Sequence, residues 1–219
     1  MMQPLYRLRR FLDPRLPYAR GSESTVFSTR SRDRKGAVCE LCGAPFDGRH
    51  AHVIDLESRR LMCTCRPCYL LFTHPGAAGG RYRSVSERVM KLSEAADSSW
   101  ESLGIPVGIA FFLRNSARGR VLAFYPSPAG ATESTLPLEA WDEIVAALPV
   151  LATLEPDVEA LLVCRRRERM ESWIVPVDAC YELVGRLRRS WKGFEGGAEA
   201  WSEIDAFFAG LEERERSCA

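Results

Sequence analysis

The residues best suited to chemistry in this sequence are cysteines, which gather in one stretch of the first third of the chain. Two C-x-x-C pairs, Cys39/Cys42 and Cys65/Cys68, are separated by 22 residues, a spacing typical of four-cysteine zinc sites. The two-residue spacer lets both thiolates of a pair reach one cation, and two such pairs complete a tetrahedron. We therefore predict that these four cysteines bind one metal ion, with zinc ranked first and iron as the alternative.

A fifth cysteine and two histidines lie between or beside these pairs. Cys63 precedes Cys65 by two positions, so strand alternation would place both on one face. Four roles are open for Cys63: it replaces Cys65 as a ligand, packs as a small apolar side chain, joins a cluster of five thiolates, or lies near the metal without binding it. His50 and His52 also share a face, just ahead of Asp55. Cys63, His50 and His52 are possible further metal ligands, and the alternative is that the histidines cover the metal module or cap its hairpin.

The rest of the sequence offers little for catalysis. It contains no GxSxG or HExxH motif, and no histidine follows His74, which excludes Ser–His or Cys–His catalysis in the C-terminal part. Cys164 and Cys180 are expected to be packed thiols. The glycine-rich loop HPGAAGGRYR lacks the strand-to-helix context of a phosphate-binding fingerprint, so we interpret it as a linker. We assign no catalytic and no other cofactor-binding residue, and we predict that the protein is not an enzyme.

Composition describes a globular protein with a substantial core. Of the 219 residues 46% are hydrophobic and 27% are charged, which is ordinary for a folded domain. A formal charge of +1 gives no global electrostatic reason to expect nucleic-acid binding. No stretch has the features of a signal peptide, and no apolar run is long enough to span a bilayer. We therefore expect a cytoplasmic location, where the eight cysteines remain reduced.

The N-terminal region divides into an arm and a metal module. Residues 1–37 carry nine Arg and Lys against three Asp and Glu, which indicates a basic, partly flexible arm. Residues 38–83 form the four-cysteine module and its glycine-rich loop. Within it we expect short strands over 52–56 and 60–63, joined by a turn, and a helical turn over 69–72. This order of knuckle, hairpin, knuckle and helix is typical of zinc ribbons and treble clefs, in which the metal replaces a hydrophobic core.

The second half of the chain predicts an α+β domain. A capping box, Ser84-x-x-Glu87, opens a predicted connecting helix over 84–104. In residues 105–215, the runs PVGIAFFLR and RVLAFYP flank the turn NSARG, and DVEALLVCR and ESWIVPV flank RRRERM, so we expect two antiparallel hairpins. Three amphipathic helices are also expected: over 137–148, from Asp178 onward, and from about Trp201 to Leu211. The predicted class is thus α+β, with a four-cysteine module followed by hairpins and three to four helices lying on one face of the sheet.

The cysteine motifs resemble those of known metal modules. CELCG is similar to the first knuckle of zinc ribbons and of rubredoxins. CTCRPCY departs from the rubredoxin pattern, which expects proline straight after the first cysteine and glycine after the second; here Pro67 precedes Cys68 and Tyr69 follows it. A structural zinc site therefore ranks first and a rubredoxin-like iron site for electron transfer second.

A third resemblance is to HNH endonucleases, which combine a CxxCG knuckle and a histidine-rich strand with a separate catalytic metal. That family usually has Asn or His on the helix after the last cysteine, where this chain has Tyr69. Without that ligand a hydrolytic metal would be poorly held. A nuclease is therefore the third-ranked function.

Over about residues 36–215 the chain resembles a bacterial family of unknown function, found mostly in high-GC Gram-positive organisms. The resemblance rests on CELCG, CTCRPCYLLF, PGAAGGRYR and VLAFYPSPAG. Members are encoded beside [NiFe]-hydrogenase subunits and their accessory factors, which implies a role in assembly of a hydrogenase or in electron transfer to it. We expect a non-catalytic, metal-stabilised accessory protein whose partners are hydrogenase subunits or maturation factors, and we expect neither nucleic acid nor a membrane span.

Overall fold

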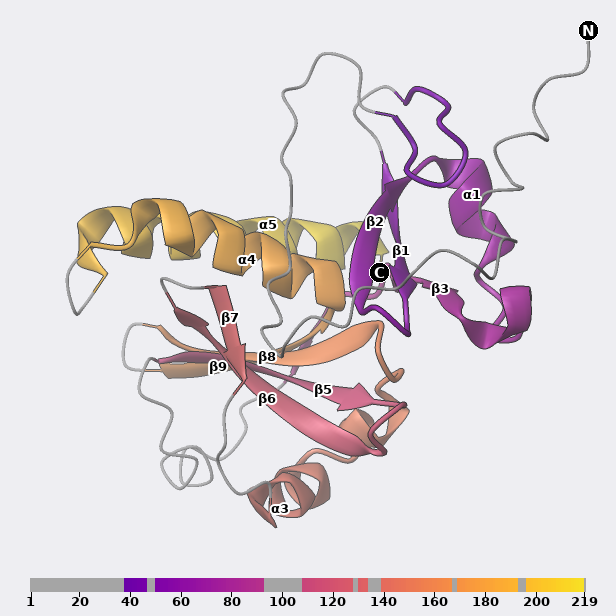
Figure 1. The fold of residues 1–219 in the computed structure, drawn as a ribbon. Helices are drawn as coiled ribbons and strands as arrows, with labels where there is room; N and C mark the ends of the chain where they lie inside the picture. Colours follow the sequence, from indigo (N-terminus) through magenta and orange to yellow (C-terminus); the bar gives the residue numbers. More distant parts are fainter. Residues whose placement is uncertain are drawn as a thin grey trace, which may run out of the picture.

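The computed structural model describes residues 38–46, 50–92, 108–127, 130–133, 139–166, 169–192 and 196–218. The basic arm predicted for residues 1–37 lies outside this set. Figure 1 shows a small antiparallel sheet beside a larger one that carries most of the helices. Among the described residues, no helix combines the length and apolar character needed to cross a membrane.

The larger sheet, called the main sheet below, is antiparallel throughout and has the strand order β4-β9-β8-β5-β6-β7. Both predicted hairpins are confirmed. Strands β8 and β9 pair over eight positions, with Leu162 opposite Trp173. The strands are β4 (Met90–Leu92), β5 (Ile109–Asn115), β6 (Arg120–Ser127), β7 (Gly130–Glu133), β8 (Glu159–Arg166) and β9 (Arg169–Pro176).

Both faces of the main sheet are covered, which corrects the expectation that helices lie on one face. Helices α4 (Val177–Ser190) and α5 (Gly197–Cys218) cover one face, and α3 (Glu139–Ala147) with the 3-10 turn η3 (Pro149–Thr153) lies at the other (Figure 1). Leu162 belongs to the core cluster under α4 and α5, whereas its neighbour Leu161 belongs to the cluster under α3. A strand such as β8 is apolar on both faces, so it must be covered on both.

The three helices predicted for the domain are confirmed, with one change that affects the site. Helix α4 begins at Val177, with Pro176 in the N-cap position, so Asp178 lies inside the first turn instead of capping the helix. The carboxylate of Asp178 is therefore available to another element. Helix α5 buries one stripe of side chains against the main sheet: Ala200, Ile204, Phe207, Phe208 and Leu211.

The connecting helix predicted over 84–104 is wrong for the part that the structure describes. Residues 85–89 form neither helix nor strand, and Met90–Leu92 form β4, the edge strand that pairs with β9. Val85 and Val89 are buried in the core beneath α4 and α5. Side chains four residues apart share a face in a helix and in a strand alike, so their spacing did not distinguish the two. Residues 93–107 lie outside the described set.

The small sheet has the order β2-β1-β3 and contains β1 (Ala51–Asp55), β2 (Arg60–Thr64) and β3 (Tyr82–Ser84). The predicted hairpin of β1 and β2 is confirmed, and α1 (Arg66–Leu71) follows it directly. The glycine-rich segment is not a plain linker. After the 3-10 turn η2 (Ala77–Gly80) it ends in β3, which pairs with β1 through Arg83 opposite Ile54.

Polar and apolar contacts join the small sheet to the main one. The guanidinium of Arg83 donates to the carbonyl of Pro156 at 2.9 Å and to Glu155 Oε2 at 2.8 Å. Ser86 Oγ donates to the buried carboxylate of Glu159 at 2.8 Å. Leu61 of β2 packs against the core under α4 and α5. The four-cysteine module therefore packs against the α+β domain through these hydrogen bonds and apolar contacts.

Candidate metal centre

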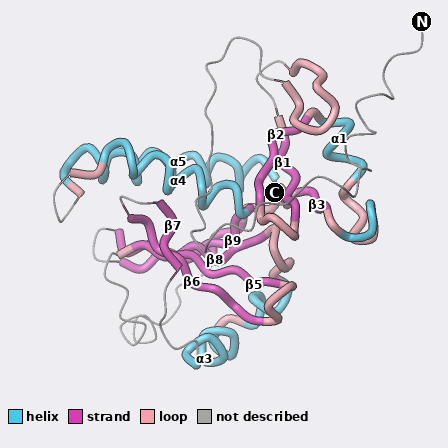
Figure 2. Tube along the Cα trace, in the orientation of Figure 1, coloured by secondary structure: helices cyan, strands magenta, loops and turns pink. Residues whose placement is uncertain are grey.

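The four paired cysteines lie at one end of the small sheet, in a loop and at the start of helix α1. Cys39 and Cys42 belong to the loop 38–46, which an isolated bridge between Val38 and Pro45 closes, and Cys65 and Cys68 lie directly after β2. Figure 2 shows the first loop arching beyond β1 and β2 toward α1. The four Sγ atoms all lie within 4.8 Å of one another. The cysteines grouped from the sequence are thus brought together, and below they are called the four-cysteine group.

The sulfur spacing fits coordination to a single ion. Cys42 Sγ lies 3.7 Å from Cys65 Sγ, whereas a disulfide would join them at about 2.05 Å. Two thiolates bound to zinc at about 2.3 Å and at the tetrahedral angle are about 3.8 Å apart. The four-cysteine group can therefore hold one tetrahedral metal ion.

Local backbone chemistry explains how the two loops form. In CELCG, the N–H of Gly43 donates to the carbonyl of Cys39 at 2.8 Å, and Gly43 adopts a φ of +73° that favours glycine. In CTCRPC, Pro67 lies in the first turn of α1 with Cys65 as the N-cap residue. Proline is tolerated there because the first helical N–H groups have no intrahelical acceptor. This helix start places Cys68 one turn after Cys65.

Thiol ionisation within the four-cysteine group is uneven. For Cys39, burial opposes ionisation, but backbone N–H groups of Cys42, Cys65 and Leu41 outweigh it and lower the pKa of the thiol to about 7. Burial raises the pKa of Cys65, and burial together with the neighbouring sulfurs raises that of Cys68. Four close thiols cannot all ionise without a compensating charge, and a divalent cation supplies that charge and deprotonates its ligands.

Most of the four-cysteine group is buried by the protein. Cys39, Cys65 and Cys68 are buried, whereas Cys42 is exposed. Leu41 and Phe46 are the partly buried apolar side chains packed against this cluster. Four protein ligands fill a tetrahedral ion and leave no position for substrate, which is the mark of a structural site.

A second group contains His50, His52 and Cys63, whose ligand atoms also lie within 4.8 Å of one another. We call it the His–Cys group. Cys63 lies directly opposite His52 in the β1–β2 pair, and its Sγ is 3.6 Å from His52 Nε2. The other nitrogen of that ring, Nδ1, is 2.6 Å from Asp178 Oδ2 of α4. The Cys63 sulfur thus lies beside the two histidines and is not grouped with the four paired cysteines.

Electrostatics favours the contact between His52 and Asp178. Burial by itself lowers the pKa of His52, but the hydrogen bonds to Asp178 and Cys63 outweigh burial and raise this pKa to about 9. No sequence signal pointed to Asp178, which lies 126 positions from His52.

Comparison with known proteins decides the family. The model of a family of unknown function, DUF5947, matches residues 38–215. The chain belongs to DUF5947. No curated protein and no solved structure matches significantly. The matched segment of this DUF5947 member includes the four-cysteine group, the His–Cys group and both sheets, and it leaves the predicted basic arm outside. The expected membership in a family of unknown function is confirmed.

Three polar side chains that could have joined these groups have other roles in the DUF5947 fold. Asp55 accepts N–H groups of the β1–β2 turn and lies 2.8 Å from the guanidinium of Arg81. Although burial raises the pKa of Asp55, the hydrogen bond from Arg81 outweighs it and lowers that pKa. The Tyr69 hydroxyl is buried and donates to the carbonyl of Val85, and His74 Nδ1 accepts the N–H of Gly76.

The cysteines of the α+β domain are packed thiols, as predicted. Cys164 and Cys180 are both buried in the core under α4 and α5. Burial raises the pKa of Cys164 to about 12 and that of Cys180 well above its ordinary value. Neither thiol has the lowered pKa that marks a reactive cysteine.

Proposed function

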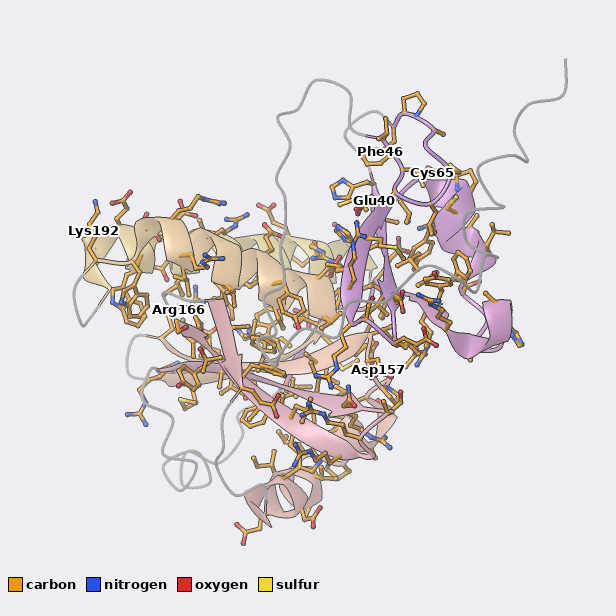
Figure 3. All side chains as sticks on the ribbon, in the orientation of Figure 1. Glu40, Phe46, Cys65, Asp157, Arg166 and Lys192 are labelled. Atoms are coloured by element: carbon orange, nitrogen blue, oxygen red, sulfur yellow. The ribbon has the colours of Figure 1, made fainter. Side chains whose placement is uncertain are left out.

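We propose that this DUF5947 protein is a non-catalytic accessory protein, in which a zinc ion in the four-cysteine group shapes a surface that binds another protein. The observation that carries the proposal is the makeup of the cluster at the end of the small sheet. It consists of Cys39, Cys65 and Cys68, with Leu41 and Phe46 packed against them. Figure 3 shows Phe46 and Cys65 together at this end of the molecule. So little apolar surface cannot order two loops, and a bound ion would supply the missing free energy.

Exposed apolar side chains support an interaction role. Among the described residues, the large hydrophobic side chains that remain exposed are Val38, Leu70, Leu71 and Trp201. Three of these four belong to the cysteine-bearing segments. From the family resemblance we propose that the partners are [NiFe]-hydrogenase subunits or maturation factors, and that binding takes place in the cytoplasm.

Electron transfer by an iron ion in the same group is the second candidate. It is favoured by one observation: Cys42 is exposed, so an electron would have a short route to a partner. Zinc ranks above iron because Pro67 and Tyr69 depart from the rubredoxin knuckle. The nuclease alternative has the least support. Tyr69 takes the position of the nuclease metal ligand, but its hydroxyl is buried and hydrogen-bonded to the carbonyl of Val85.

Metal content of anaerobically purified protein, measured with a visible spectrum of the same sample, tests the proposal. After dialysis we expect one retained zinc ion per chain and no colour. The Cys39→Ser variant should lose this zinc because three thiolates cannot close the site. Cys180→Ala, which removes a buried thiol elsewhere, is the control and should keep it.

Iron with a red colour in the wild type would instead favour the electron-transfer role, because ferric tetrathiolate absorbs visible light and zinc does not. Equal metal content in Cys39→Ser and wild type would contradict the assignment of the four-cysteine group as the ligand set.

A further inference from the structure

The His–Cys group shares no residue with the four-cysteine group, and the proposed function does not use it. We infer that His50, His52 and Cys63 form a second metal site, open on one side, for a borderline-soft divalent transition-metal ion such as Zn²⁺ or Co²⁺. The ligand set of two imidazoles and one thiolate suits ions of this class. The inference does not depend on which metal occupies the four-cysteine group.

Distances in this group agree with coordination. An imidazole nitrogen at about 2.05 Å from zinc and a thiolate at about 2.3 Å, at the tetrahedral angle, are about 3.6 Å apart. His52 Nε2 and Cys63 Sγ are separated by 3.6 Å. The two residues are direct partners across β1 and β2, so the pairing of the strands sets this separation.

Asp178 prepares His52 to act as a ligand. Its Oδ2 accepts a hydrogen bond from Nδ1 of His52 at 2.6 Å. In the neutral ring that binds a metal, this bond keeps the proton on Nδ1 and leaves the Nε2 lone pair on the side of Cys63. Metal-binding histidines commonly donate their second ring N–H to a carboxylate in this way, because the contact fixes the ring and increases its basicity. The carboxylate comes from α4, so the α+β domain positions a ligand on the small sheet.

His50 supplies the third ligand atom and the route to solvent. Its ring stacks on Phe46, with centroids 5.4 Å apart, and meets the ring of His52 edge-on at 4.8 Å. His50 is exposed, whereas His52 and Cys63 are half-buried. Three protein ligands leave a fourth position for water or another donor. This ion should therefore exchange more readily than one enclosed by the four-cysteine group.

The order of thiol, imidazole and carboxylate is also that of a nucleophilic cysteine site. His50 decides between the two interpretations. A nucleophile needs one imidazole as its base, whereas a second imidazole nitrogen within 4.8 Å of the same sulfur completes a set of three ligands.

Cobalt binding to full-length protein with zinc already in the four-cysteine group tests the inference. We expect one Co²⁺ per chain by equilibrium dialysis, with the visible bands of tetrahedral cobalt and a thiolate-to-cobalt charge-transfer band. His50→Ala should weaken Co²⁺ binding by at least about tenfold, and Asp178→Asn by about 10–100-fold, the usual cost of losing a partner of a ligating histidine. Cys63→Ser should remove the charge-transfer band. Bound Co²⁺ should protect Cys63 from alkylation.

His74→Ala is the matched control, since His74 is exposed and lies outside both groups. It should bind Co²⁺ like the wild type. Circular dichroism and zinc content, measured on each variant, separate loss of the site from loss of the fold or of the ion in the four-cysteine group.

Each of the following results would overturn the inference: no Co²⁺ uptake by the wild type, uptake matched by release of zinc, or equal affinity in wild type, His50→Ala and Cys63→Ser. Rapid alkylation of Cys63 at saturating Co²⁺ would also overturn it and favour the nucleophile.

Discussion

Leu71 shows how one side chain can link the metal module to a partner. It ends helix α1, which starts between Cys65 and Cys68, and 67% of its surface is exposed. An exposed leucine is common on protein surfaces. Here, however, Leu70 is its exposed neighbour, and both lie on the short helix that an ion in the four-cysteine group would fix. An interaction through this helix would therefore depend on the metal.

We predict that Leu71→Ser weakens binding to the proposed partner without changing the metal content of the protein. Co-expression of the tagged protein with [NiFe]-hydrogenase subunits and maturation factors, followed by affinity purification, measures the effect. Loss of one central apolar contact commonly costs about 2 kcal/mol or more of binding free energy, so recovery should fall at least about tenfold.

Trp201→Ser is the control, because Trp201 is also a large exposed apolar side chain but lies on α5, outside the cysteine-bearing segments. The partner assignment would fail if none of these proteins was recovered with the wild type.

The segment 84–92 shows how an element is chosen by contacts beyond its own sequence. The N–H of Val85 donates to the carbonyl of His52 in β1, and the carbonyl of Val85 accepts the hydroxyl of Tyr69. Its side chain is buried in the core under α4 and α5. A helix starting at Ser84 would form its own backbone hydrogen bonds. It would, however, remove Val85 from the carbonyl of His52, the hydroxyl of Tyr69 and the core under α4 and α5.

We predict that Val85→Ala destabilises the protein by about 2 kcal/mol, since it removes buried methyl groups and leaves a cavity. Urea unfolding of the zinc-loaded protein measures the change. Alanine favours helices more than valine does, so a helical segment would instead gain stability from the substitution.

Glu87→Ala provides the comparison, because Glu87 makes an exposed ion pair with Arg66 and should contribute less than about 1 kcal/mol. Equal effects of the two substitutions would show that Val85 is not buried as described.

Over the whole molecule, the proposed metal ion and the apolar core would stabilise different parts of the chain. The main sheet has apolar clusters on both faces, whereas the four-cysteine group has little apolar surface around it. Leu61 and the contact between His52 and Asp178 join the two parts. Loss of the ion should therefore reach the main sheet only through contacts between the two parts, which include these two and the hydrogen bonds of Arg83 and Ser86.

We predict that removal of the ion from the four-cysteine group by a strong chelator unfolds the cysteine loops and leaves the main sheet folded. The binding free energy of such an ion, on the order of 10 kcal/mol, is folding free energy for the segment that it orders. In hydrogen exchange by mass spectrometry, amides of the loop 38–46 and of α1 should lose protection, while those of β8 and β9 keep it. Simultaneous loss of protection in β8 and β9 would show that the two parts fold as one unit.

Features that depend on local spacing could be predicted from the amino-acid order alone. The C-x-x-C pairs predicted the four-cysteine group because each pair needs only a short turn to bring two sulfurs together. The hairpins around NSARG and RRRERM, and the stripe of α5, were predictable for the same reason: their patterns repeat over a few adjacent residues.

Long-range packing sets the features that depend on surfaces meeting after the chain has folded. It turned residues 90–92 into the edge strand β4, added β3 to the small sheet and covered both faces of β8. It also placed Asp178 against His52, a contact between residues 126 positions apart. Such a pairing leaves no periodic trace in the sequence, because the docking of α4 against the small sheet sets the distance between the two side chains.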